Sequence, residues 1–224
     1  MSARPWWAVA AVLGVTGCTS LPAPPEPAPV NSPAPVTPGP AASLPTQDDL
    51  RRLLLTADDL PGYTLQPEPP GASPGSASSE FTGCPALTPS SEGPSVTVAV
   101  NFSGGLIGPK IGETITASSG EQAQRTVDGI AALARQCPAY TAVTGGQTMT
   151  MTVVAMELAP MGDASAGLQM TGTVPNLPPV RAEAIVIRSG NLVIQVSQAT
   201  AFPPDRELTL STARRALEKA EQGR

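Results

Sequence analysis

The sequence predicts an α+β domain: an antiparallel β-sheet of about five to six strands with helices packed mainly on one face. Three observations lead to this prediction. Several segments alternate hydrophobic and polar residues with the period of a strand. A Ser-x-x-Glu box at residues 118–121 precedes a helical hydrophobic pattern, and Gly190-Asn191 separates two strand-like segments. Strands that do not alternate regularly with helices are typical of the α+β class.

The predicted domain spans residues 47–222 and begins with a short helix. Thr46 is a favourable N-cap for residues 47–55, and Asp48 and Asp49 lie in the first turn, where carboxylates interact favourably with the helix dipole. We therefore expect a helix at the start of the domain.

Two strands and a long helix are expected next. Residues 95–102 alternate, with their hydrophobic side chains on one face, and residues 111–117 form a second strand. The helix opens at the box of residues 118–121 and ends at Gln136, because Pro138 cannot continue it. Its apolar stripe consists of Ala123, Val127, Ile130, Ala134 and Cys137.

The rest of the chain predicts further strands and a final helix. The strands are expected at 148–158, 167–174, 181–188 and 192–199. Gly190-Asn191 joins the last two as a hairpin, and residues 184–187 are apolar on both faces, as in a central strand under a helix. The final helix, at 206–221, carries Leu210, Ala213, Leu217 and Ala220 on one face.

The N-terminus has the features of an exported, lipid-anchored protein. Residues 1–17 combine a positive charge with an apolar run about half as long as a membrane-spanning helix, which predicts a signal peptide. Val15-Thr16-Gly17-Cys18 resembles the lipobox of bacterial lipoproteins, in which the cysteine receives a diacylglycerol and becomes the first residue of the mature chain. Two acyl chains on Cys18 would anchor the protein stably in a membrane.

Residues 18–46 are expected to form the lipidated N-terminus and a Pro-rich linker. Their many prolines favour an extended polyproline II spacer that reaches on the order of 80 Å. After removal of the signal peptide, two cysteines remain, Cys84 and Cys137. An even pair in an exported protein predicts a disulfide bond.

The composition argues against several classes of function. The chain has no histidine, so it lacks the commonest general base and the imidazole ligands of many metal sites. Its 13 Lys and Arg and 18 Asp and Glu are scattered, without the basic stripe of nucleic-acid-binding proteins. The pairs Asp48-Asp49 and Asp58-Asp59 lack the ligand spacing of a calcium loop. We expect no enzyme activity, metal, cofactor or nucleic-acid partner.

The methionines suggest a ligand site. Every methionine after the signal peptide falls within residues 149–170, in one predicted hairpin. Methionine is flexible and polarizable, and it suits irregular apolar cavities. We therefore predict an apolar ligand surface between the helix-covered face of the sheet and this hairpin. Its residues are Phe102, Ile130, Met149, Met151, Met156 and Met170. The alternative is that these side chains fill a solid core.

The chain resembles a family of actinobacterial lipoproteins. The residues that carry the resemblance are the lipobox, the Pro-rich linker, "LLLTADDLPGYT" (residues 53–64) and "EQAQRTVDGIAALARQC" (residues 121–137). These lipoproteins have a domain similar to the extracellular sensor domain of the mycobacterial kinase PknH. The resemblance implies a disulfide that ties the end of a helix to the region before the sheet, a ligand cleft between sheet and helices, and no catalytic residues. It departs in one respect, because that domain has two disulfides and this chain can form one.

These features predict a non-catalytic ligand-sensing or binding module, lipid-anchored on the extracytoplasmic face of the cell membrane. Two alternatives remain open at this point. The first alternative is a lipid or glycolipid carrier with an apolar cavity. The second is a scaffold for protein–protein interaction. The expected partners are the membrane, through the N-terminal lipid, and a small apolar ligand or another protein of the cell envelope.

Overall fold

The computed structural model describes residues 43–67, 80–87, 93–144 and 147–223. The predicted signal peptide, Cys18 and the linker up to residue 42 lie outside the described residues. None of the helices in the described ranges combines the length and hydropathy of a membrane span.

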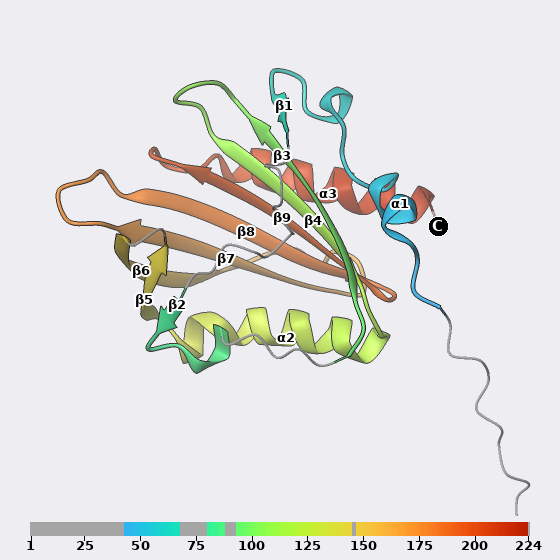
Figure 1. The fold of residues 1–224 in the computed structure, drawn as a ribbon, viewed down its shortest axis with the longest axis horizontal. Coiled ribbons are helices and arrows are strands. Elements are labelled where there is room, and N and C mark those ends of the chain that lie inside the picture. Colours follow the sequence, from blue (N-terminus) through green and yellow to red (C-terminus); the bar gives the residue numbers. More distant parts are fainter. Residues whose placement is uncertain (1–42, 68–79, 88–92, 145–146, 224) are drawn as a thin grey trace, which may run out of the picture. The chain divides into compact units, whose positions relative to one another are not determined.

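One antiparallel sheet dominates the fold (Figure 1). Its nine strands lie in the order β1-β3-β4-β9-β8-β7-β6-β5-β2. Their bounds are β1 Thr64–Gln66, β2 Glu80–Thr82, β3 Val96–Ser103, β4 Lys110–Ala117, β5 Ala139–Thr144, β6 Gln147–Met156, β7 Ala164–Thr173, β8 Val180–Ser189 and β9 Leu192–Thr200. The long strands β4, β9, β8 and β7 form its centre, and the three-residue strands β1 and β2 form its edges.

Three α-helices accompany the sheet in the described part of the chain: α1 Gln47–Arg51, α2 Gly120–Gln136 and α3 Arg206–Gln222. Two 3₁₀ turns, η1 Ala57–Asp59 and η2 Pro85–Leu87, complete the elements. Thr46 caps α1 as expected and forms a reciprocal capping box with Asp49. The cap of α2 is Ser119, one residue after the predicted position, and its hydroxyl accepts from the backbone N–H of Gln122 at 3.2 Å.

The two long helices cover opposite faces of the sheet, as Figure 1 shows for α2 and α3. Successive residues of a strand point to opposite faces. In β8, Ile185 and Ile187 belong to a core cluster with Ala213 and Ala216 of α3. Val186, between them, packs with Val127 of α2. Residues 184–187 are therefore apolar on both faces because a helix lies over each face.

The predicted fold class is wrong in strand number and in helix placement. The chain has nine strands where about five to six were expected, so the fold is closer to all-β than to α+β. The missed strands have a physical reason: β1 and β2 have three residues each, too few to show a period, and β5 begins directly after Pro138. Helices mainly on one face were expected, but α2 and α3 lie on opposite faces, and the residues of β8 that are apolar on both sides fit this arrangement equally well.

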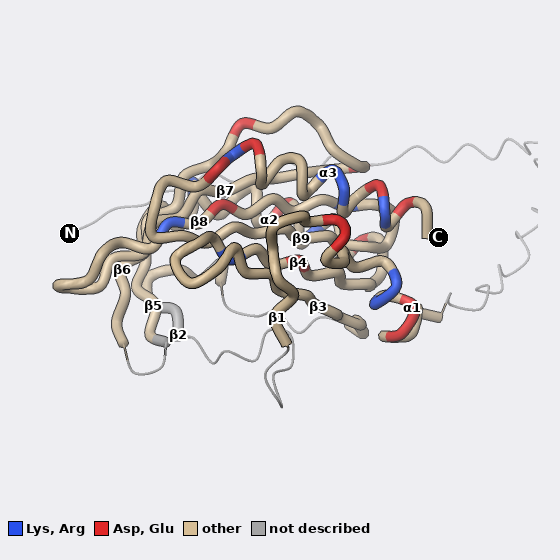
Figure 2. The backbone as a smooth tube through the Cα atoms, turned by 90° about the horizontal axis from the view of Figure 1, so that it is seen from above, with Lys and Arg blue, Asp and Glu red and all other residues tan. Residues whose placement is uncertain are grey.

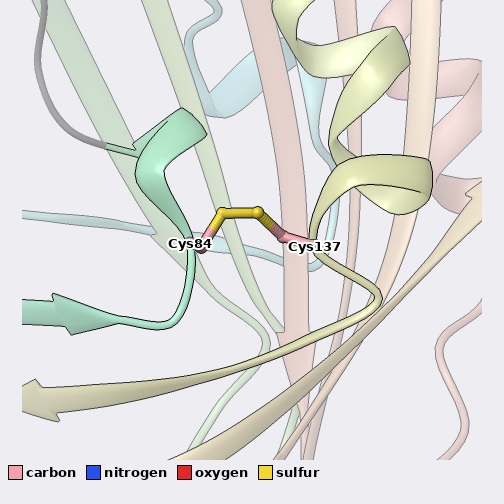
Figure 3. The surroundings of a disulfide bond; sticks show 2 residues. All are labelled: Cys84 and Cys137. Atoms are coloured by element: carbon pink, nitrogen blue, oxygen red, sulfur yellow. A yellow bond between two sulfur atoms is a disulfide. The ribbon is translucent and has the colours of Figure 1, made fainter. Parts of the chain in front are cut away.

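A disulfide bond joins Cys84 to Cys137 (Figure 3). Cys137 is the C-cap of α2, and Cys84 directly precedes η2. Both residues are buried with Leu133 and Val153 in a second core cluster beneath α2. The bond therefore fixes the C-terminal end of α2 to the segment that enters η2.

Candidate ligand-binding site

The six residues predicted to form an apolar ligand surface lie on both faces of the sheet. Phe102 has no exposed surface and lies in the cluster that packs against α1 and α3. Ile130, Met151 and Met170 pack against the other cluster, beneath α2. The structure thus brings three of the predicted residues together and separates Phe102 from them.

The two remaining methionines also differ in position. Met156 follows Ala155, whose partner Leu168 belongs to the α2 cluster, so strand alternation directs Met156 to the opposite face. Met149 lies over Gly172, because a Cβ at that glycine would overlap its sulfur. The sulfur of Met151 would be 3.0 Å from the same Cβ. Methionine side chains therefore occupy the space above Gly172, and the six residues do not line one common surface.

A hollow lies between α3 and the segment that runs from η1 into β1. Its volume is about 180 Å³. Its lining residues are Asp59, Leu60, Pro61, Tyr63, Leu208, Ser211, Thr212 and Arg215. The turn at Pro61-Gly62 shapes one wall, because Gly62 has a φ of 89°, which favours glycine, and the backbone N–H of Tyr63 donates to the carbonyl of Leu60. The hollow is thus built from a tight turn and one face of a long helix.

Asp59 ties the turn to α3. Its Oδ2 accepts from the ammonium of Lys219 at 2.7 Å, and its backbone carbonyl accepts from the Arg215 guanidinium. Burial raises the pKa of Asp59, but hydrogen bonds from Lys219 and from Thr56 outweigh it and hold this pKa at about 2. The carboxylate is therefore charged and paired with Lys219, so the side chain of Asp59 does not neutralise the guanidinium of Arg215.

Thr212 supplies the hollow with a buried polar group. The residue is 3% exposed, and its hydroxyl has no hydrogen-bond partner among the described residues. An unpaired buried hydroxyl costs free energy, and a ligand that bonds to it removes that cost. Burial, and then the charge of Asp205, raises the pKa of Tyr63, whose phenol therefore stays protonated. Apolar walls with a few polar groups are typical of small-molecule sites.

The sequence contained part of the signal for this hollow. The segment "LLLTADDLPGYT" contributes Asp59, Leu60, Pro61 and Tyr63 to the lining. In the described ranges, no group of three or more acidic, cysteine or histidine residues is arranged to hold a metal ion. The positions of Thr212 and Arg215 could not be found from the sequence, because only the packing of α3 against residues 57–63 brings them to the turn.

The fold is similar to that of a solved extracellular domain. The structure of the extracellular domain of PknH from Mycobacterium tuberculosis matches with a TM-score of 0.57 and 10% sequence identity, over 81% of this chain and 100% of that chain. CalU16 from Micromonospora echinospora matches with a TM-score of 0.23 and 12% identity, over 58% of this chain and 95% of its own. No protein-family model and no curated protein matches the sequence. The expected PknH-like fold is thus confirmed.

Proposed function

We propose that this chain is an extracytoplasmic lipoprotein, anchored in the membrane through Cys18, whose domain is a non-catalytic ligand-sensing or binding module. The observation that carries the proposal is the hollow beside α3, which Thr212 and Arg215 line together with apolar side chains and where Thr212 has a buried hydroxyl without a hydrogen-bond partner among the described residues. The fold that the chain shares with the extracellular domain of PknH also supports an extracytoplasmic sensing or binding module.

The chemistry of the hollow favours a small carboxylate with an apolar body. Thr212 can donate a hydrogen bond, and Arg215 adds a positive charge that Asp59 does not neutralise with its side chain, which pairs with Lys219. Leu60, Pro61 and Leu208 provide the apolar wall. Catalysis has no basis in this set, because the chain has no histidine and the carboxylate of Asp59 is held in its ion pair.

Ligand-observed NMR with benzoate as the probe tests this proposal. We expect saturation transfer to benzoate, less transfer to the neutral analogue benzamide, and loss of the benzoate signal in Arg215→Gln. Thr212→Val keeps the shape of the side chain and removes the hydroxyl, so it should weaken binding about fivefold to tenfold. Met170→Ala, beneath α2, is the matched control and should leave binding unchanged. Equal binding by Arg215→Gln and the wild type would refute the site.

The lipid-carrier hypothesis placed its cavity at the methionine hairpin. The side chains of Met149 and Met151 occupy the space above Gly172 in that region. This packing disfavours a lipid cavity above Gly172.

A further inference from the structure

Three uncharged loop segments lie at one end of the sheet. They are residues 104–109 between β3 and β4, 174–179 between β7 and β8, and 201–204 between β9 and α3. Their sequences are GGLIGP, VPNLPP and AFPP. The antiparallel order β3-β4-β9-β8-β7 directs all three to the same end (Figure 1), and the loop that projects furthest is uncharged along its whole length (Figure 2). We refer to these three loops as the apolar end.

Large hydrophobic side chains are exposed at the apolar end. Leu106 is 101% exposed, Ile107 77% and Phe202 58%, and Leu177 and Val180 are also exposed. Among the described residues, seven large hydrophobic side chains are exposed in this way; four of them lie in the three loops, and Val180 directly follows the second loop. Of these five, all but Leu177 surround a hollow of about 410 Å³. Such a concentration of exposed apolar surface marks an interaction site.

Positive charges lie directly behind these loops. Lys110, at the start of β4, lines the hollow, and its ammonium donates to the hydroxyl of Ser103 at 2.6 Å. Arg181, at the start of β8, donates to the carbonyl of Ala201 at 3.4 Å. The first acid after the third loop, Asp205, accepts from the backbone N–H of Leu208 as the N-cap of α3. In a chain with a net charge of −5, Lys110 and Arg181 therefore give this apolar end two basic side chains, and Asp205 adds one acid beside the third loop.

We infer that the apolar end is a membrane-contact surface, which inserts Leu106, Ile107 and Phe202 into the interface of a bilayer that contains anionic lipids. The interior of a lipid bilayer is deformable and can bury side chains that project from loop tips in any arrangement. A folded protein partner would need a separate matching hollow for each of these side chains. Lys110 and Arg181 lie where anionic headgroups would meet them, and basic residues near such a surface strengthen binding. The linker predicted at residues 18–46 is long enough to let this end turn towards the bilayer.

Vesicle co-sedimentation tests the inference without the lipid anchor. The chain of residues 18–224 carrying Cys18→Ser should bind vesicles of phosphatidylcholine with phosphatidylglycerol, and bind phosphatidylcholine alone more weakly. Lys110→Gln and Arg181→Gln should each reduce partitioning about fivefold. The double variant Leu106→Ser/Ile107→Ser should reduce it at least about tenfold. Val154→Ser, exposed on β6, and Arg214→Gln, exposed on α3, are matched controls that should change nothing.

A tryptophan reporter gives a second readout. The chain from residue 18 onwards contains no tryptophan, so all tryptophan fluorescence of Leu106→Trp would come from position 106. This fluorescence should shift to shorter wavelength when the variant binds the anionic vesicles. Two results would overturn the inference directly: no vesicle binding by the unlipidated chain, or equal vesicle binding by the wild type and Leu106→Ser/Ile107→Ser. A third is a dimer in sedimentation velocity that becomes monomeric in this double variant, which would assign the surface to a second copy of the chain. None of these results bears on benzoate binding beside α3.

Discussion

The backbone N–H of Leu55 donates to Oε2 of Glu113 at 2.6 Å, and this hydrogen bond joins residues 58 positions apart. Glu113 lies in β4 with no exposed surface, and its Oε1 has no hydrogen-bond partner among the described residues. Burial raises the pKa of Glu113 to about 7, although the Leu55 N–H and the charge of Lys219 act to lower it. The carboxyl therefore links the segment after α1 to the sheet and changes charge near neutral pH.

This raised pKa predicts that stability depends on pH. A carboxyl whose pKa is higher in the folded than in the unfolded state stabilises most below its unfolded pKa, and that contribution is lost as the pH rises towards 7. The difference between the two pKa values corresponds to about 3 kcal/mol. Glu113→Gln should remove this contribution, so the variant gains stability relative to the wild type between pH 5 and pH 8.

Urea unfolding at both pH values measures the effect. Glu218→Gln, on the exposed side of α3, is the control and should follow the wild type. If the difference in the free energy of unfolding between Glu113→Gln and the wild type were the same at pH 5 and pH 8, Glu113 would not titrate in this range.

The disulfide bond should stabilise the folded protein, because it lowers the conformational entropy of the unfolded chain. It closes a loop with a sequence separation of 53 residues, for which the loss of chain entropy corresponds to about 4 kcal/mol. Cys84→Ala/Cys137→Ala should therefore lower the melting temperature while most of the sheet is kept. Circular dichroism during heating measures both effects, and alkylation of the denatured, unreduced wild type should find neither thiol. Two free thiols in the exported protein would contradict the bond.

The methionines beneath α2 should behave as core residues. Met170 packs with Ile130 and Met151 against the buried Leu133 and Leu168. Met170→Ala should cost about 2 kcal/mol, at the low end for a core truncation because the side chain is only partly buried. Chemical unfolding measures this cost. A much smaller cost, together with altered uptake of an apolar fluorescent probe, would instead indicate a cavity wall and revive the predicted methionine surface.

The sequence was most informative where a pattern is local. The caps of α1 and α2, the Gly190-Asn191 hairpin and the alternation of β3 depend on neighbouring residues, and each was located to within about a residue. The strands β1 and β2 are too short to have a period, so the sequence could not reveal them.

The candidate site depends on contacts that no local pattern contains. Lys219 bonds to Asp59 across 160 residues, and this contact sets one wall of the hollow beside α3. The faces of the sheet were hidden from the sequence for a similar reason: Phe102 and Met151 are both apolar strand residues, but they pack in core clusters on opposite faces.

The lipid anchor is testable in the producing cell. Cys18→Ser removes the thiol that would carry the diacylglycerol, so the variant should leave the detergent phase, whereas Cys84→Ala/Cys137→Ala should stay in it. Phase partitioning with mass analysis of the N-terminal peptide measures this. A Cys18→Ser protein that fractionated with membranes as completely as the wild type would contradict the anchor.

A titration of the isotope-labelled chain with benzoate, followed by amide chemical shifts, tests the central claim most directly. The account predicts that the largest shifts occur in residues 57–63 and 208–215, on the two walls of the hollow beside α3, and that they disappear in Arg215→Gln. Shifts confined to α2 and to residues 149–156, or no shifts at any benzoate concentration, would contradict it.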